Sequence, residues 1–219
     1  MPPSTPTVRL EWPGKSASRP ALAARLEPAR SGHPACMLVQ GDNLLAMRAM
    51  RERPSARFSL VYLDPPSFTG RQHDRVDRRR DPETGNVVRL MRPAFDDRWN
   101  GLHHYLGELG QRIEAARDLL AADGCLVVHV DPKTSHYAKV MCDEVFGPEC
   151  FASEIVWRYR RWPAKTKNFQ RVHDVLLRYV RDPDIEPKFR QLYEPLAPST
   201  LQTWGDRKQR AVVGSDGRR

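Results

Sequence analysis

Apolar positions at helical spacing mark two stretches in the middle of the chain. In residues 102–120 apolar side chains recur every three or four positions, which predicts the strongest helix of the chain, ended by Asp123-Gly124. A second helix, with apolar positions between Tyr137 and Val145, is predicted to stop at Gly147-Pro148.

Short apolar runs rich in strand formers alternate with these helical patterns. They occupy residues 36–39, 58–63, 125–131, 154–157 and 173–180. This alternation predicts an α/β fold, with a mostly parallel sheet covered by helices on both faces. The run 58–63 is interpreted as a buried strand that delivers Asp64 to its C-terminal edge, where open α/β sheets bind ligands.

A third helix is predicted just after the first strand. Gly41 forms the turn, Asp42 or Asn43 is the N-cap, and Leu44, Met47 and Met50 lie on one helix face.

Three stretches carry no sustained periodicity. Residues 1–35 are predicted to be a flexible tail with a short helix at 21–26, and residues 183–219 an irregular segment, which leaves 36–182 as the folded region. The polar stretch 71–97 is predicted to be a long loop, either functional or a solvated run of charge.

Length and composition are those of one globular domain. The chain has 219 residues, 40% of them hydrophobic, and no run of 18 apolar residues or signal-peptide pattern, so we expect a cytoplasmic protein. The cysteines, Cys36, Cys125, Cys142 and Cys150, contain no C-x-x-C pair, and the seven histidines show no metal spacing. We therefore expect buried thiols and no metal.

The net charge of +9 points weakly to a polyanionic partner. More informative is the stretch 158–171, which has six basic residues, three aromatic residues and no acidic residue. Such a combination suits phosphate contacts and base stacking, with scattered surface charge as the alternative. The candidate nucleic-acid-binding residues are Arg158, Arg160, Arg161, Trp162, Lys165 and Lys167.

The stretch that carries chemistry is Asp64-Pro65-Pro66. The two prolines fix the backbone and remove two N–H donors, so the carbonyls of Asp64 and Pro65 remain available as acceptors beside the carboxylate. This cluster suits a substrate that offers two N–H donors from one nitrogen, such as the exocyclic amino group of a nucleobase.

Asp64-Pro65-Pro66-Ser67-Phe68 resembles the fourth motif of the DNA amino-methyltransferases, and Gly41-Asp42-Asn43-Leu44 and Thr69-Gly70 resemble their permuted, beta-type branch. The resemblance extends over residues 37–180. It implies a Rossmann-like sheet, S-adenosyl-L-methionine as cofactor, and duplex DNA with a flipped target base as substrate.

Site roles also follow from the resemblance. Asp64 and the Pro65 carbonyl would hold the target amine. They belong to an acceptor motif that continues through Pro66, Ser67 and Phe68. The residues that would face the cofactor are Asp42, Asn43 and Asp64. Ser67 replaces the family's stacking aromatic residue, and Phe68 is a substitute one residue later. On spacing alone, Asp42 could equally be only a helix cap.

No strand followed by a Phe-x-Gly-x-Gly turn is found. In the permuted branch this turn lies further toward the C-terminus, so we expect an incomplete sheet, a fragment inactive alone, and a dimer or a restriction-system partner subunit as possible assemblies. Adenine is the expected base. Methylation of cytosine, RNA or protein, and a non-catalytic DNA-binding remnant, are the alternatives.

Overall fold

The computed structural model describes residues 8–15, 25–27, 37–53, 57–82, 84–163, 165, 167–190 and 198–204. The chain divides into two compact units, Met1–Lys188 and Phe189–Arg219. Among its described residues, the first unit contains the central sheet and three α-helices. The second unit contains the short helix α4 (Pro198–Trp204), within a region expected to be irregular.

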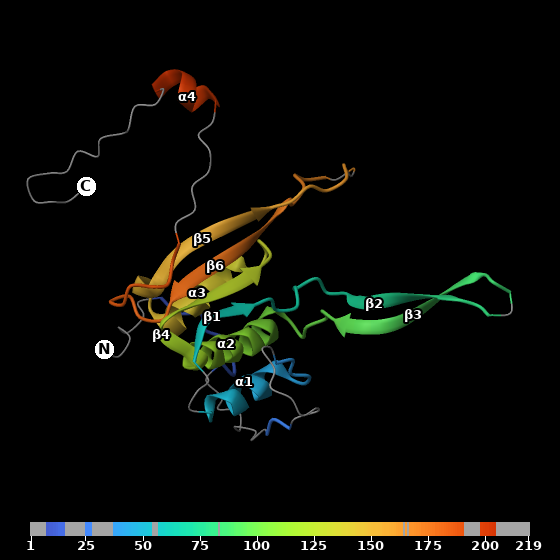
Figure 1. Ribbon diagram of the computed structural model, residues 1–219, viewed down its shortest axis with the longest axis horizontal. Helices are drawn as coiled ribbons and strands as arrows, with labels where there is room; N and C mark the ends of the chain where they lie inside the picture. The colour runs from blue at the N-terminus through green and yellow to red at the C-terminus, as the bar shows by residue number, and fades with distance from the viewer. Residues whose placement is uncertain are drawn as a thin grey trace, which may run out of the picture. The chain divides into compact units, whose positions relative to one another are not determined.

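The central sheet has the strand order β1-β4-β6-β5 (Figure 1). Its strands are β1 (Phe58–Leu63), β4 (Leu120–Val130), β5 (Phe151–Arg158) and β6 (His173–Val180). β1 pairs with β4 in parallel, whereas β4–β6 and β5–β6 are antiparallel. The expectation of a mostly parallel sheet is therefore wrong for the described strands, because the segment between β5 and β6 returns the chain directly and forms an antiparallel pair.

β1 was expected to be buried, but it lies at the edge of the sheet. Leu60 and Tyr62 are 53% and 49% exposed, while Val61 and Leu63 pack against the core. The outer side of β1 pairs with no described strand. One covered face and one uncovered face explain the alternating exposure of this apolar run.

The strand predicted at 36–39 is also not observed. Met37–Gln40 has no regular structure, Leu38 is 96% exposed, and Cys36 lies outside the described residues. Because a strand is stabilised by its neighbours, an apolar run without a described pairing partner remains irregular.

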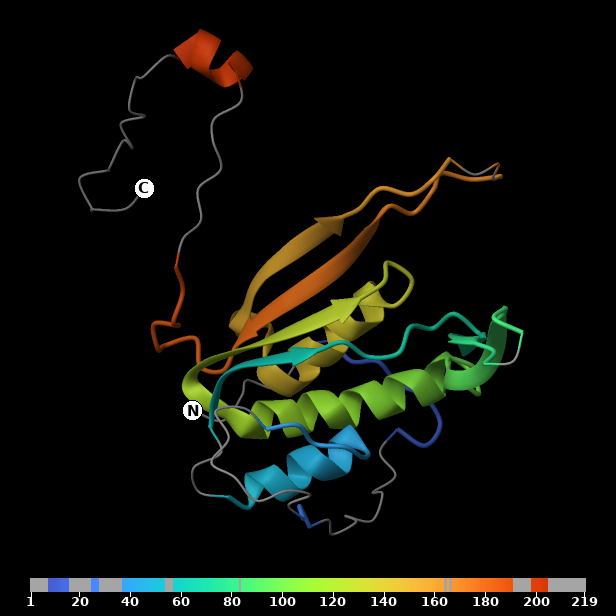
Figure 2. The same ribbon diagram turned by 45° about the vertical axis from the view of Figure 1, so that its right-hand side comes forward.

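α2 (Leu102–Leu119) and α3 (Ser135–Phe146) contact each other and lie on one face of the sheet (Figure 2). Ile113, Cys142 and Leu177 are fully buried between these helices and the strands. α1 (Asn43–Arg51) packs on α2. Helices on both faces were expected, but the other face is not covered by a helix in the described part of this unit.

The helix boundaries follow the sequence with one exception. α3 ends at Gly147, whose φ of 95° favours glycine, and a 3-10 turn follows at Pro148–Cys150. α2 ends at Leu119 rather than at Asp123-Gly124, because β4 begins at Leu120 and includes both of those residues.

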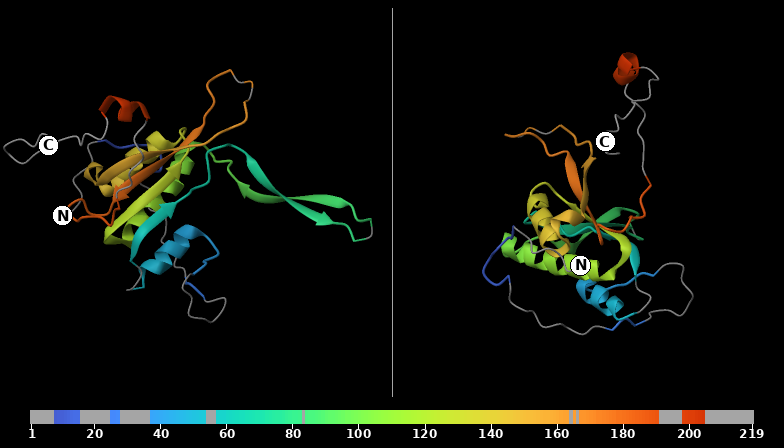
Figure 3. Two further views of the ribbon diagram at one scale, coloured as in Figure 1. Left: turned by 45° about the horizontal axis from the view of Figure 1, so that its top comes forward. Right: turned by 90° about the vertical axis from the view of Figure 1, so that its left-hand side faces the viewer.

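The stretch predicted to be a loop forms a two-stranded antiparallel ribbon of β2 (Gln72–Arg80) and β3 (Val87–Asp96), which projects from the sheet (Figure 3, left). Its side chains are almost all exposed and carry no apolar–polar alternation. The prediction was wrong because it relied on burial periodicity, which a strand pair without a core does not have.

The N-terminal region was expected to be a tail, but its described segment 8–15 lies against α3. The Leu10 N–H donates to Glu144 at 2.7 Å, and Lys15 pairs with the same carboxylate. Residues 25–27, at the end of the helix expected at 21–26, are not helical, and the rest of that helix lies outside the described residues.

Two of the cysteine side chains, Cys142 and Cys150, are buried, Cys125 is partly buried, and all three are free thiols. No described helix is both long and apolar enough to cross a membrane.

Candidate functional site

The C-terminal ends of β1 and β4 meet at one edge of the sheet. The two strands are parallel, and Leu63 is in register with Val128. β6 runs antiparallel to β4, with Val130 opposite Val175, so β6 begins at this same edge. Asp64, His129 and Asp174 therefore lie at adjacent positions although they are distant in sequence, at the sheet edge that binds ligands in α/β folds.

A small pocket of about 220 Å³ lies at this edge. It is lined by Asp64, Pro65, Ser67, Tyr105, His129, Val130, Asp131, Thr134 and Asp174. Three of these residues are carboxylates, and their oxygens can only accept hydrogen bonds when ionised. The pocket is therefore suited to a ligand that presents N–H donors.

His129 lies between two of the carboxylates. Its Nδ1 is 3.6 Å from an Asp64 oxygen, and its Nε2 is 3.5 Å from an Asp174 oxygen. The Tyr62 hydroxyl is 3.0 Å from the same Nδ1 and forms a hydrogen bond with it. Desolvation, with a smaller effect of the Asp64 charge, raises the pKa of Tyr62, so the phenol stays protonated near neutral pH.

Tyr105 and Asp131 form the other wall of the pocket. Burial raises the pKa of Tyr105 to about 12, although its hydrogen bond with Thr134 acts in the opposite direction. An Asp131 oxygen accepts the backbone N–H groups of Lys133 and Thr134. These bonds fix the turn between β4 and α3, so the wall is held by backbone contacts.

The acceptor motif divides between the pocket and the core. Pro65 and Ser67 line the pocket and Pro66 is exposed. Phe68 is not among the lining residues. It is partly buried against the core, with its ring centroid 5.7 Å from that of Tyr105. Ser67, at the motif position where the family has its aromatic residue, thus lines the pocket, whereas Phe68 does not.

The predicted cofactor residues Asp42 and Asn43 lie apart from this pocket. Asp42 is the N-cap of α1 and accepts from the N–H groups of Leu44 and Leu45 at 2.9 and 3.1 Å. Arg112 of α2 donates to Asn43 at 2.8 Å and lies 3.4 Å from Asp42. Both side chains hold α1 in place, and neither lines the pocket with Asp64.

The basic segment between β5 and β6 leaves the sheet at the pocket edge, because Arg158 is opposite His173. The predicted DNA-binding residues Arg158, Arg160, Arg161, Trp162, Lys165 and Lys167 are all exposed, and the Trp162 ring is 92% exposed. At the end of the segment, Arg171 lies 3.4 Å from Asp131 in the pocket wall. The segment therefore adjoins the pocket, with its cationic groups available to a ligand.

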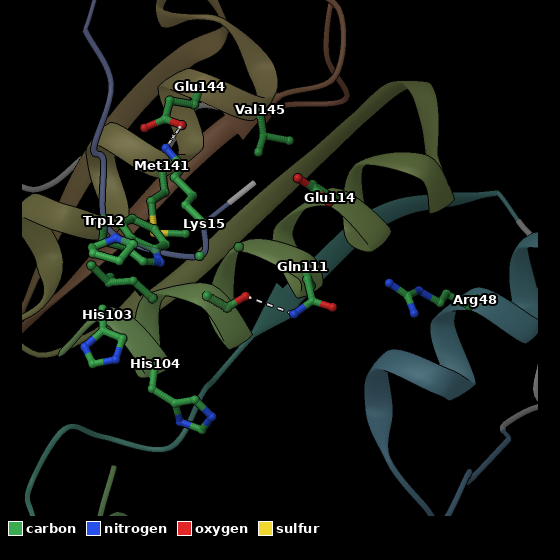
Figure 4. A pocket seen from close by; sticks show the side chains of 15 residues that line it. Trp12, Lys15, Arg48, His103, His104, Gln111, Glu114, Met141, Glu144 and Val145 are labelled. Carbon is green, nitrogen blue, oxygen red and sulfur yellow. Dashed lines mark hydrogen bonds and ion pairs between the residues drawn. The ribbon is translucent and has the colours of Figure 1, made fainter. Parts of the chain in front are cut away.

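A larger hollow of about 610 Å³ lies elsewhere in the same unit (Figure 4). The N-terminal segment with Trp12 and Lys15 forms one wall, and side chains of α2 and α3, including Gln111 and Glu144, form the others. None of the predicted site residues lines this hollow. Among the described residues, no group of three histidine, cysteine, aspartate or glutamate side chains has metal-binding geometry.

Four polar residues of the pocket were not predicted as site residues: Tyr105, Asp131, Thr134 and Asp174. His129 was placed inside the predicted strand 125–131 and was given no site role. A usable signal was present, because His129, Asp131 and Asp174 stand at the ends of predicted strands. Strand order was needed to show that these ends are adjacent.

Comparison with known proteins identifies the class. The model of the DNA methylase family, of the N6/N4 methyltransferase type, matches residues 58–210, which include β1 with the acceptor motif and all the later described elements. The chain belongs to this family.

Several relatives belong to restriction-modification systems. The Mod subunit of the type III restriction-modification enzyme EcoP15I of Escherichia coli is 26% identical over 185 residues, which are 71% of this chain and 27% of that protein. The corresponding EcoPI Mod subunit of Escherichia phage P1 is 26% identical over 179 residues, which are 69% of this chain and 27% of that protein. The type II methyltransferase M.EcaI of Enterobacter cloacae is 32% identical over 145 residues, which are 65% of this chain and 28% of that protein. The chain thus spans about a quarter of the length of these relatives.

Proposed function

We propose that this chain is the acceptor-binding part of an enzyme that transfers a methyl group from S-adenosyl-L-methionine to the exocyclic amino group of adenine in duplex DNA. The observation that carries the proposal is the pocket at the sheet edge, where Asp64 and Pro65 stand together with two further carboxylates. Its volume of about 220 Å³ is below the roughly 300–1,000 Å³ of common small-molecule sites and suits a single base.

The pocket residues suggest how the amine is held. In this proposal the Asp64 carboxylate accepts one amine proton and the Pro65 carbonyl accepts the other. Two such hydrogen bonds favour a pyramidal nitrogen, whose lone pair is then less delocalised into the ring and more nucleophilic. Because the target nitrogen is inaccessible inside a stacked duplex, the base must be flipped into the pocket.

His129 offers a stabilising role beside Asp64. The His129 ring lies between the Asp64 and Asp174 carboxylates, at 3.6 and 3.5 Å. In this position it would limit the movement of the Asp64 carboxylate and so help to hold the base.

The predicted cofactor residues and the pocket at Asp64 do not together form a cofactor site. Asp42 and Asn43 are engaged with the α1 backbone and Arg112, and the pocket at Asp64 is too small for a base and a cofactor together. We therefore propose that a further segment, which pairs with the outer edge of β1 in the permuted arrangement, supplies the rest of the cofactor site, and that the 219-residue chain is inactive alone.

The relatives named as Mod subunits motivate a proposal for the assembly. The complete protein would act in the cytoplasm within a restriction-modification system, as a dimer or with a partner subunit.

The test uses the complete protein that contains this chain, incubated with duplex DNA and isotopically labelled S-adenosyl-L-methionine. Nuclease digestion and mass spectrometry should identify N6-methyladenine. Detection of N4-methylcytosine instead would change the proposed target base from adenine to cytosine. Methylation of RNA or protein would contradict the proposal. Cofactor and DNA binding without methylation of any substrate would favour a non-catalytic remnant.

A further inference from the structure

The β2–β3 ribbon carries an unusual arrangement of positive charge. Arg78 is directly opposite Arg89, and Arg75 is directly opposite Arg92. Side chains at opposed positions of an antiparallel pair lie on the same face within about 5 Å, so like charges there destabilise the pairing. A two-stranded ribbon is only marginally stable by itself, and the Arg78–Arg89 pair weakens it further.

The two faces of the ribbon differ. One face carries Arg75, Arg79 and Arg92, and there Asp77 pairs with Arg75 at 2.6 Å. The other face carries Arg78, Arg80 and Arg89 with one carboxylate, Asp74, beside the exposed side chains of Val76 and Met91. None of these three arginines forms an ion pair with a residue that the structure describes. This second face is named the basic face, and its charges are available to an anionic ligand.

The base of the ribbon is fixed to the acceptor loop. Asp97, 1% exposed, follows β3, and its backbone bonds to Gly70 and Arg71 close the ribbon. Its carboxylate accepts the Thr69 hydroxyl at 3.0 Å and lies 3.2 Å from His73. Thr69 is two residues from Ser67 in the pocket, so the ribbon starts at a defined position beside the site.

The ribbon and the basic segment 158–171 leave the sheet on the same side, at the strand ends that form the pocket. β1 ends at this edge and leads into β2, and β5 ends there opposite the start of β6. The left view of Figure 3 shows the ribbon and the β5–β6 connection as separate projections from this side. A duplex with one base in the pocket would therefore have cationic surface on two sides.

We propose that the basic face of the β2–β3 ribbon, with Arg78, Arg80 and Arg89, binds the phosphates of duplex DNA next to the acceptor pocket. The inference rests on the proposed function, because it takes DNA as the substrate of that pocket. Phosphates relieve the repulsion between Arg78 and Arg89, and the major groove of B-DNA admits a two-stranded β-ribbon. The ribbon thus becomes a second DNA-contacting arm, independent of segment 158–171.

The test measures duplex DNA binding by the full chain, with fluorescence anisotropy across a salt series. The double variant Arg78→Gln/Arg89→Gln should bind about 10-fold more weakly near 0.1 M salt, and its plot of log affinity against log salt should flatten by about 1.8. Arg78→Lys/Arg89→Lys keeps both charges and should retain the wild-type slope. Arg9→Gln/Arg53→Gln removes two exposed arginines from elsewhere in the unit and is the matched control.

The outcomes separate the two proposals. If the wild-type chain binds duplex DNA and the Arg78/Arg89 variant keeps both its affinity and its slope, the ribbon inference is overturned and the proposed function stands. If the wild-type chain shows no duplex binding, the ribbon inference is overturned, whereas the proposed function is decided separately by the methylation assay on the complete protein. Circular dichroism checks that the variants are folded. Loss of self-association in the variant without a change in DNA affinity would assign the basic face to a second copy of the chain, and that too overturns the inference.

Discussion

His129 Nδ1 lies 3.6 Å from a carboxylate oxygen of Asp64, although 64 residues separate them in the chain. The contact exists because β1 and β4 are parallel neighbours that end at the same edge. It places a group that can carry positive charge beside the carboxylate at the start of the acceptor motif.

Replacing Asp64 by alanine in the complete, cofactor-competent protein should reduce methyl transfer by at least about 100-fold, because the target amine loses one of its two acceptors and its orientation. Cofactor affinity should stay within a few-fold. The measurement is transfer of tritiated methyl groups to duplex DNA, with cofactor binding followed separately. Asp184→Ala, at an exposed carboxylate, is the control, and a near-normal rate for Asp64→Ala would refute the assignment of Asp64.

Neutralising Arg160 and Arg161 together should weaken DNA binding, because both guanidinium groups are exposed in the segment next to the pocket. Each lost phosphate contact should flatten the salt dependence of log affinity by about 0.9. Arg158, Lys165 and Lys167 are tested in the same way. An unchanged slope in a salt titration would assign these residues to a merely solvated surface.

The 219-residue chain should bind S-adenosyl-L-methionine negligibly in calorimetry. The outer edge of β1 has no described partner strand, and Asp42 is occupied as a helix cap. Binding should recover in the complete protein, which under the proposed function contains the rest of the cofactor site. Micromolar affinity of the purified chain alone would show that the described residues already contain the cofactor pocket.

Tyr179→Phe should lower the free energy of unfolding by about 1–3 kcal/mol, because it removes a hydrogen bond to a charged group in the core. The Tyr179 hydroxyl donates to Asp143 at 2.6 Å, and its burial together with this bond raises its pKa well above the usual range. Asp143 remains paired with Lys139, which limits the loss. Urea denaturation measures the effect. Tyr137→Phe, at an exposed tyrosine, should change the same free energy by less than ~0.5 kcal/mol, and equal effects of the two substitutions would contradict the prediction.

The sequence by itself determined the elements whose side chains are sorted by burial. α2 and α3 were predicted because their apolar positions repeat at helical spacing, and β6 was predicted with its observed limits. Asp64-Pro65-Pro66 could also be identified, because the backbone restriction imposed by two prolines is a local property. The N-cap role of Asp42 is local for the same reason.

Only the tertiary structure decided what depends on neighbours. The exposure of β1, the lack of a strand in the described residues 37–39 and the antiparallel pairing of β6 follow from which strands lie side by side, and an apolar run does not specify its partners. The ribbon of β2 and β3 was missed because its strands are held by cross-strand backbone bonds and bury no face. The pocket depends on strand order in the same way, since His129 and Asp174 reach Asp64 only when β4 lies between β1 and β6.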